Sequence, residues 1–288
     1  MTQKKTILDL YKMKENGGKA AWTTAYDCCF AAYAEKAGMD MILVGDSMGM
    51  VVYGYQGTIP VTMDMCINAC QAVRRGAPNT YVIGDMPFGS YHESVTSAVH
   101  NAVRFIKEGD VDAVKLEGGV AVTEVIKAIV RAGIVVFGHV GLTPQSSTAM
   151  GGFRAQGRTV ESARAVIQDA IAVYEAGSRC ILLEGIPEAV GAFIHRILPI
   201  PVYGIGAGSD TDGQVLVVGD SLGMFEAFKP KFAKKYADIA GVATQGFAQF
   251  IKEVKEGSFP ASEHKYSISG DIVEFEKLFI EMESNLRK

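Results

Sequence analysis

The 288-residue sequence is 48% hydrophobic, and its 28 basic and 32 acidic side chains give a formal net charge of −4. This composition supports one large core and excludes a mainly disordered chain. The slightly acidic balance, without a block of Lys or Arg, excludes nucleic acid and anionic membrane as expected partners. No stretch resembles a signal peptide or reaches the roughly 18 apolar residues of a membrane span, so we expect a cytoplasmic protein.

Short apolar segments alternate with segments of helical periodicity from residue 20 to about residue 223. Eight apolar segments are typical of buried strands: 21–25, 41–44, 81–84, 113–116, 135–138, 179–183, 202–205 and 215–218. Apolar residues three or four apart predict helices over 28–37, 63–75, 95–107, 120–132, 160–176 and 188–197. Many of these helical segments are followed by glycine, which commonly ends a helix.

Eight such units predict a parallel sheet covered by helices, and at this length they favour a closed (βα)₈ TIM barrel. A doubly wound open sheet is the alternative, but no G-x-G-x-x-G motif follows the first strand. The run GIGAG at 204–208 comes too late for that motif and is interpreted as a tight turn. We therefore expect one barrel domain over 1–288, with a C-terminal helical extension from about residue 225.

The pattern changes after residue 223. Residues 230–236 predict the start of a basic helix, and residues 242–255 predict an amphipathic helix that ends at Gly257. In the tail after Gly270, apolar residues recur at spacings of 3, 4, 3 and 4 on an otherwise charged helix: Ile272, Phe275, Phe279, Met282 and Leu286. This apolar stripe must pack either on the barrel or on a neighbouring subunit.

Two charged residues lie in the fourth predicted strand. Lys115 and Glu117 are two positions apart, so their side chains point to the same side of the strand. A buried cation and anion are costly unless they are paired or used. The pair is therefore either an internal ion pair or part of a functional site.

Polar side chains also follow the other predicted strands, where the active sites of parallel barrels lie. They are Asp27 after the first strand, Asp46 and Ser47 after the second, Asp85 after the third, His139 after the fifth and Glu184 after the sixth. Capping of the next helix is the alternative for Asp46, Ser47 and Asp85, and it is the better interpretation for Asp27. His139 fits a site residue or a packed histidine equally well.

Several carboxylates that share one pocket repel each other unless a cation joins them. Oxygen ligands without a Cys/His cluster favour Mg²⁺ over Zn²⁺. Such an ion can chelate a 2-oxo acid and stabilise the enolate formed when the adjacent carbon loses a proton. Lys115 would neutralise the substrate, or form a Schiff base if burial lowers its pKa. Both alternatives predict carbon–carbon bond chemistry next to a carbonyl.

One short motif occurs twice. VGDSMGM at 44–50 recurs as VGDSLGM at 218–224, each time after an apolar segment. The residues alone do not say which aspartate, Asp46 or Asp220, is functional.

Taken together, these motifs resemble the ketopantoate hydroxymethyltransferase (3-methyl-2-oxobutanoate hydroxymethyltransferase) family. The resemblance runs from about residue 5 to 266 and rests on these stretches: TAYD (24–27), VGDSMGM (44–50), PVT (60–62), VRRGAP (73–78), DMPF (85–88), VKLEGG (114–119), GHVGLTPQ (138–145), GGFRAQG (151–157), LE (183–184), GIGAG (204–208) and DGQVLV (212–217). The tail beyond about residue 267 has no placed counterpart.

The resemblance implies a barrel that transfers a one-carbon unit from 5,10-methylenetetrahydrofolate to 3-methyl-2-oxobutanoate, which gives 2-dehydropantoate for pantothenate and coenzyme A synthesis. It implies that Asp46 and Asp85 bind Mg²⁺, with Glu117 on the ion or its water. Asp46, Ser47, Asp85 and Lys115 would contact the oxo acid, and Glu184 would be the catalytic acid/base. Asp220 inherits no catalytic role. A homo-oligomer, often a decamer, is implied as well.

Two other functions fit the acidic strand ends. A Mg²⁺-dependent carbon–carbon lyase of the isocitrate lyase or phosphoenolpyruvate mutase type would need no folate. A non-catalytic barrel that binds a small acid and serves as a scaffold would need neither folate nor a catalytic acid.

Overall fold

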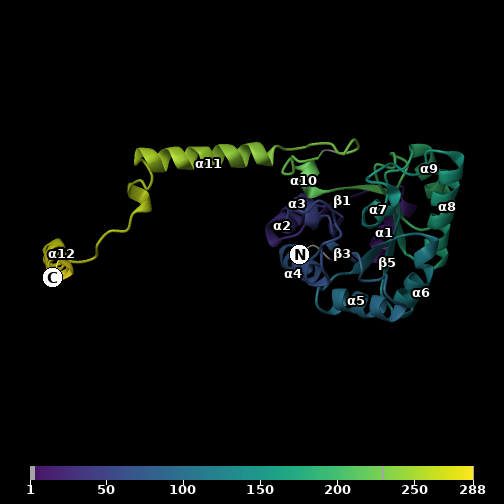
Figure 1. The fold of residues 1–288 in the computed structure, drawn as a ribbon, viewed down its shortest axis with the longest axis horizontal. Coiled ribbons are helices and arrows are strands. Elements are labelled where there is room, and N and C mark those ends of the chain that lie inside the picture. Colours follow the sequence, from purple (N-terminus) through teal and green to yellow (C-terminus); the bar gives the residue numbers. More distant parts are fainter. Residues whose placement is uncertain (1–3, 229, 288) are drawn as a thin grey trace. The chain divides into compact units, whose positions relative to one another are not determined.

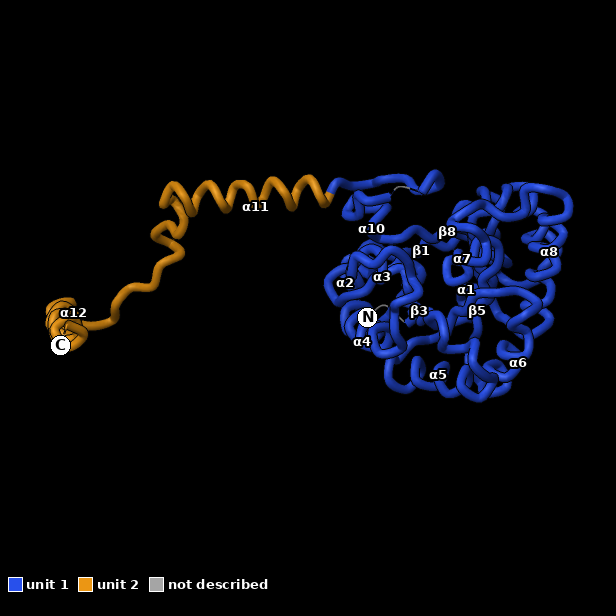
Figure 2. The backbone as a smooth tube through the Cα atoms, viewed as in Figure 1, with its two compact units in different colours: residues 1–238 blue, residues 239–288 orange. Residues whose placement is uncertain are grey.

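The computed structural model describes residues 4–228 and 230–287, which divide into two compact units with a boundary after Asp238 (Figure 2). In the described part of the larger unit, parallel strands pair in chain order and close into a barrel between the first and the last (Figure 1). The strands are β1 (Ala20–Thr24), β2 (Met41–Val44), β3 (Tyr81–Asp85), β4 (Ala113–Glu117), β5 (Val136–Gly141), β6 (Cys180–Glu184), β7 (Val202–Ile205) and β8 (Gly213–Leu216). The predicted closed barrel is confirmed, and the open sheet is wrong.

The main helices also lie where their periodicity predicts them. They are α2 (Cys28–Ala37), α4 (Met63–Gly76), α5 (Val95–Lys107), α6 (Thr123–Arg131), α8 (Val160–Glu175) and α9 (Glu188–Ile197). Short helices α3 (Met48–Val51), α7 (Ser147–Met150) and α10 (Val218–Ser221) lie in loops that follow strands. The capping interpretation of Asp27 is confirmed, because its carboxylate accepts hydrogen bonds from Cys29 N at 2.8 Å and Phe30 N at 2.9 Å.

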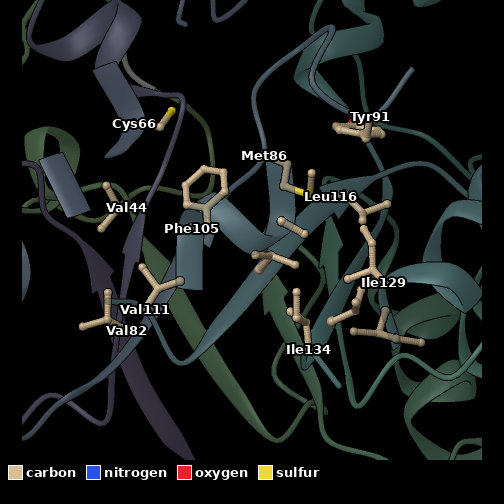
Figure 3. Close-up of a cluster of buried hydrophobic side chains, with 14 of the residues drawn as sticks. Val44, Cys66, Val82, Met86, Tyr91, Phe105, Val111, Leu116, Ile129 and Ile134 are labelled. Atoms are coloured by element: carbon tan, nitrogen blue, oxygen red, sulfur yellow. The ribbon is translucent and has the colours of Figure 1, made fainter. Parts of the chain in front are cut away.

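Two apolar layers hold the barrel together. The outer layer packs strand residues against the surrounding helices, as with Val82 of β3 and Phe105 of α5 (Figure 3). The inner layer fills the barrel with side chains that alternate with the outer ones along each strand, including Trp22, Tyr81 and Phe137. The interior is thus a packed core, and only its rim is available for chemistry.

One helix of the barrel unit was not expected from the polar start of the chain. Helix α1 (Ile7–Glu15) buries a single residue, Leu10, which packs into the inner layer of the barrel. Two ion pairs also hold α1 and the residues before it to the rest of the barrel unit. Lys14 pairs with Asp212 at 2.8 Å, and Lys5 pairs with Asp40. A short helix with one buried side chain has too weak an apolar periodicity to be recognised in the sequence.

Residues 230–236 are not helical, so the predicted basic helix is wrong there. This segment makes its hydrogen bonds elsewhere: Tyr236 N donates to Ser221 O at 2.7 Å. The ring of Phe232 lies so close to Gly206 that a Cβ there would come within 2.6 Å of its Cδ1. Contacts with the loops after β7 and β8 therefore override the local helical pattern.

The second unit contains α11 (Ile239–Glu256) and α12 (Ile272–Leu286), close to the two helices predicted for the tail. Neither helix buries a residue within the described part of the chain. The single-domain boundaries and the extension from about residue 225 stay predictions. No described helix combines the length and apolar character needed to cross a membrane. The cytoplasmic location also stays a prediction.

The close packing of Gly84 on α5 gives a first prediction. A Cβ on Gly84 would lie 2.4 Å from Cδ1 of Phe105, so Gly84→Ala should destabilise the barrel by about 1–3 kcal/mol through overpacking. Gly57, which has no atom within 4 Å of an added Cβ, is the matched position, and Gly57→Ala should stay within about 0.5 kcal/mol. Chemical denaturation followed by circular dichroism measures both. Equal midpoints for the two variants would contradict the packing described.

Candidate active site

The register of the barrel brings the predicted site residues to one rim. Asp85 is the register partner of Lys115, and Glu117 is the partner of His139. Glu184 ends β6, and Asp46 lies two residues beyond the end of β2. All of these are carboxyl ends of parallel strands, so the side chains converge at the same end of the barrel.

Lys115 is the centre of this cluster. Its side chain is 3% exposed, and Nζ lies 2.8 Å from Asp85 Oδ1 and 3.6 Å from Glu117 Oε1. Nζ also lies 3.1 Å from Nδ1 of His139. Nδ1 also lies 3.5 Å from Glu117 Oε1. Burial and Lys115 oppose a charge on this ring, yet Glu117 and Glu184 outweigh them and raise the pKa of His139 to about 9. The prediction that Lys115 and Glu117 share one side of the strand is confirmed.

The same histidine connects the cluster to Glu184. Nε2 of His139 lies 3.2 Å from Oε2 of Glu184, whose side chain is 15% exposed. Within the described residues Nε2 is buried and makes no well-aligned hydrogen bond, so the ring and this carboxylate are close neighbours at ion-pair distance. His139 is therefore part of the site and not only a packed histidine.

Asp46, Ser47 and Asp85 do not cap helices with their side chains. Asp85 ends β3, and its Oδ2 accepts a hydrogen bond from Asp46 N at 3.1 Å, while α5 begins only at Val95. Ser47 precedes α3 but makes no side-chain capping bond, and its hydroxyl lies 2.8 Å from the hydroxyl of Tyr26. The capping alternative is wrong at these three positions.

Burial and mutual charge set the electrostatics of the cluster. Burial raises the pKa of Asp46 well above its ordinary value, and the charges of Asp85 and Glu117 raise it further. Burial also raises the pKa of Asp85 despite the nearby Lys115. Burial opposes the charge on Lys115, yet the surrounding carboxylates outweigh it and raise its pKa. Likewise, Lys115 and His139 overcome burial and lower the pKa of Glu117. The cluster thus holds more carboxyl groups than its one lysine can neutralise.

Two supporting residues were missed in the sequence. The side-chain Nε2 of Gln145 donates to Asp46 Oδ2 at 2.8 Å and to Met86 O at 2.9 Å, and its backbone N donates to Glu117 Oε2 at 3.0 Å. Tyr91 lies beside it, with its hydroxyl 2.6 Å from Gln145 Oε1. Gln145 thus holds carboxylates from two different strand ends. Its place in GHVGLTPQ after the fifth strand was the available signal, but uncharged side chains carry little weight in a search for catalytic groups.

The cluster opens into a cavity of about 1000 Å³ at the mouth of the barrel. Its wall includes the predicted residues Asp46, Ser47, Asp85, Lys115, Glu117 and Glu184. Asp220 of α10, from the second copy of the repeated motif, lines the same cavity. All predicted site residues therefore face one space that is large enough for ligands.

The donor set suits a hard divalent ion bound by two carboxylates. Within the described residues, Oδ1 of Asp85 is buried and accepts no well-aligned hydrogen bond, although Lys115 is close. One oxygen of Asp46 is held by Gln145, which leaves the other for a ligand. No group of three acidic, His or Cys side chains in the described part of the chain is arranged to hold an ion alone. Mg²⁺ commonly uses one or two carboxylates and completes its shell with water and substrate, so Asp46 and Asp85 fit it.

Comparisons with known proteins agree with the geometry. A sequence model of the family "Ketopantoate hydroxymethyltransferase" matches residues 4–262. The chain is 61% identical over 281 residues to the 3-methyl-2-oxobutanoate hydroxymethyltransferase of Alkaliphilus metalliredigens. This alignment covers 98% of the chain and 99% of that relative. It is 51% identical over 261 residues to the enzyme of the same name from Moorella thermoacetica, with 91% and 97% covered.

Solved structures resemble the chain in fold only. The phosphoenolpyruvate phosphomutase of Streptomyces platensis subsp. rosaceus superposes with a TM-score of 0.60 at 16% identity, covering 98% of this chain and 99% of that one. A 2,3-dimethylmalate lyase of the PEP mutase/isocitrate lyase superfamily gives 0.58 at 16% identity, with 93% and 89% covered. Both support the barrel architecture.

The role of Gln145 leads to a prediction about ion binding. Gln145→Met keeps the size of the side chain but removes the amide that orients Asp46, so the affinity for Mn²⁺ should fall about 10–100-fold. Electron paramagnetic resonance of free Mn²⁺ measures this affinity. The matched control is Gln249→Met on α11, where the amide contacts only Glu253. Unchanged Mn²⁺ affinity in a folded Gln145→Met protein would show that the amide does not position an ion ligand.

Proposed function

The chain belongs to the ketopantoate hydroxymethyltransferase family and is a transferase, and on that premise we propose the details of its reaction. The one-carbon unit of 5,10-methylenetetrahydrofolate is bonded to C3 of 3-methyl-2-oxobutanoate in place of the proton lost there, one water supplies the hydroxyl group, and tetrahydrofolate is released. The product is 2-dehydropantoate, for pantothenate and coenzyme A synthesis. The observation that carries this proposal is the convergence of four carboxyl groups and Lys115 on one cavity at the barrel mouth.

The oxo acid needs a positive environment at its carboxylate and oxo oxygens. Lys115 supplies a buried ammonium group, and Asp46 and Asp85 are the residues that would hold Mg²⁺. Bound there, Mg²⁺ would polarise the 2-oxo group and stabilise the enolate. The close ion pair of Lys115 with Asp85 favours a charged lysine over a Schiff base, since a Schiff base needs a neutral amine.

Glu184 is the residue proposed to move the proton at C3. It lines the cavity, and the Nε2 of His139 lies 3.2 Å from its Oε2. Ser47, fixed by the hydroxyl of Tyr26, and Asp46 would contact the oxo acid from the neighbouring strand end. Gln145 N donates a hydrogen bond to Oε2 of Glu117 and holds this side chain in place. Held in this way, Glu117 would contact the ion or a water bound to the ion.

The lyase and scaffold alternatives receive less support. The lyase-type structures share the fold at 16% identity, which says nothing about activity. The relatives named as hydroxymethyltransferases cover almost the whole chain at 61% and 51% identity. A scaffold would have no need for a partly exposed Glu184 beside a buried cluster of carboxyl groups around Lys115.

The subunits are proposed to assemble through the tail, in a ring-built homo-oligomer that is often a decamer in this family. On α12, Ile272, Phe279, Met282 and Leu286 are each more than half exposed. Apolar faces of this kind mark contact surfaces. A second copy of the chain is the partner implied by the family.

An assay of the full chain tests the reaction. Wild-type protein should form 2-dehydropantoate only when methylenetetrahydrofolate and Mg²⁺ are both present. Glu184→Gln should bind the oxo acid but lose about 10²–10⁴-fold in exchange of the C3 proton, measured by NMR in D₂O. Glu175→Gln, on the exposed end of α8, serves as the matched control. Exchange at the wild-type rate in Glu184→Gln would refute the acid/base role.

The assembly proposal gives its own prediction. Phe279→Ser combined with Met282→Ser should reduce the mass in solution, because it removes apolar area from the contact. Light scattering measures this mass against the 30.9 kDa of one chain. Glu276→Ser with Glu283→Ser, on the same helix, should leave the mass unchanged. A wild-type monomer, or equal masses for both double variants, would contradict the proposal.

A further inference from the structure

The cavity at the barrel mouth is larger than a small branched oxo acid requires. Its volume of about 1000 Å³ is at the upper end of the range for sites that bind drug-sized ligands. The charged cluster accounts for one end of it, whereas Asp220 and several phenylalanines line the rest. The cavity therefore has room for a second, larger ligand beside the oxo acid.

Asp220 is a charged residue of this wall that the proposed reaction leaves unused. Within the described residues, its carboxylate makes no hydrogen bond and no ion pair, although its backbone N donates to Val217 O at 3.1 Å. Burial raises the pKa of Asp220 to about 6. A half-buried carboxyl group without a partner is costly, which suggests that a ligand provides its hydrogen-bond donors.

The topology places Asp220 close to the metal end of the cavity. Strand β1 pairs with β2 on one side and with β8 on the other, so Asp46 and Asp220 follow strands that flank the same neighbour. Tyr26 follows β1 directly. Burial raises the pKa of Tyr26, and the charges of Asp46 and of Asp220 both add to that effect. Groups bound at the two aspartates would thus be near neighbours.

Aromatic rings stand beside Asp220. Phe225, Phe228 and Phe232 line the same cavity. Phe232 is held against Gly206, where no side chain could fit, and Phe225 packs against Gly219 of α10. Flat apolar walls next to a lone carboxylate suit a flat heterocycle that has hydrogen-bond donors on one edge.

A reduced pterin has this chemistry. Its 2-amino group and its N3–H are parallel donors on one edge, and a carboxylate accepts two parallel donors with good geometry. We propose that Asp220 binds this edge of the tetrahydrofolate co-substrate, with the pterin ring between the phenylalanines of the cavity wall. The exposed cations Arg158 and Lys231 line the same cavity and suit the glutamate carboxylates of the folate. This inference rests on the proposed function, and it identifies the residue that selects the one-carbon donor.

The repeated motif then has two uses. VGDSMGM after β2 places Asp46 toward the oxo acid, and VGDSLGM after β8 places Asp220 toward the folate. The two copies fold differently, because Asp46 precedes α3 whereas Asp220 lies within α10, yet each copy brings its carboxylate to the same cavity.

Binding of tetrahydrofolate to the full chain tests the inference. In titration calorimetry, Asp220→Asn should bind at least about tenfold more weakly than wild type, because a charge-assisted hydrogen-bond pair is lost. Exchange of the C3 proton in the oxo acid, which needs no folate, should stay within about twofold. Asp210→Asn removes the same charge from an exposed aspartate outside the cavity and should bind like wild type.

A ligand analogue separates recognition from a structural effect. Wild type should bind 2-desamino-tetrahydrofolate more weakly than tetrahydrofolate, and Asp220→Asn should have lost most of this discrimination. Equal discrimination in the two proteins, or unchanged tetrahydrofolate binding in Asp220→Asn, would overturn the inference while leaving the proposed function intact. If Asp220→Asn does not fold, the wild type alone decides: equal affinity for tetrahydrofolate and for its 2-desamino analogue would overturn the inference. A wild type that binds no tetrahydrofolate would overturn the proposed function as well.

Discussion

The charge balance at the rim of the barrel is the constraint on which the site depends. Four carboxyl groups, from Asp46, Asp85, Glu117 and Glu184, meet the ammonium group of Lys115 and the imidazole ring of His139 at the mouth of the barrel. The barrel forces this meeting, because each acid is at or just beyond the carboxyl end of its strand. The proposed divalent ion would offset the excess of negative charge and would bind the oxo acid through its open coordination positions. The same excess of negative charge would therefore account both for ion binding and for the placement of the oxo acid.

Much of the fold was predictable because buried strands and amphipathic helices have different periods. Most predicted elements begin and end within two residues of the observed bounds. The failures have a shared cause. Helix α1 buries only Leu10, and residues 230–236 follow contacts made by Phe232 and Tyr236 with distant loops. Tertiary contacts that a local pattern does not encode decide such segments.

The site was predictable to a different degree. Charged residues at strand ends are conspicuous, because an apolar strand gives no local reason for a lysine or an acid. Their convergence followed from topology alone. The uncharged supports Gln145 and Tyr91 were not predictable, because their contacts join segments distant in sequence. Asp220 was recognised in the sequence as part of a repeated motif, but a role for it could be proposed only once the structure placed it in the same cavity wall as Phe225, Phe228 and Phe232.

The most direct test of the central claim is anomalous diffraction from crystals of the full chain grown with Mn²⁺ and 3-methyl-2-oxobutanoate. The account predicts one strong peak per chain, within about 2.5 Å of oxygens from both Asp46 and Asp85, with the oxo acid on its open side. A fully occupied oxo acid seated against Lys115 with no peak between the two aspartates, or a peak bound elsewhere in the barrel, would contradict it.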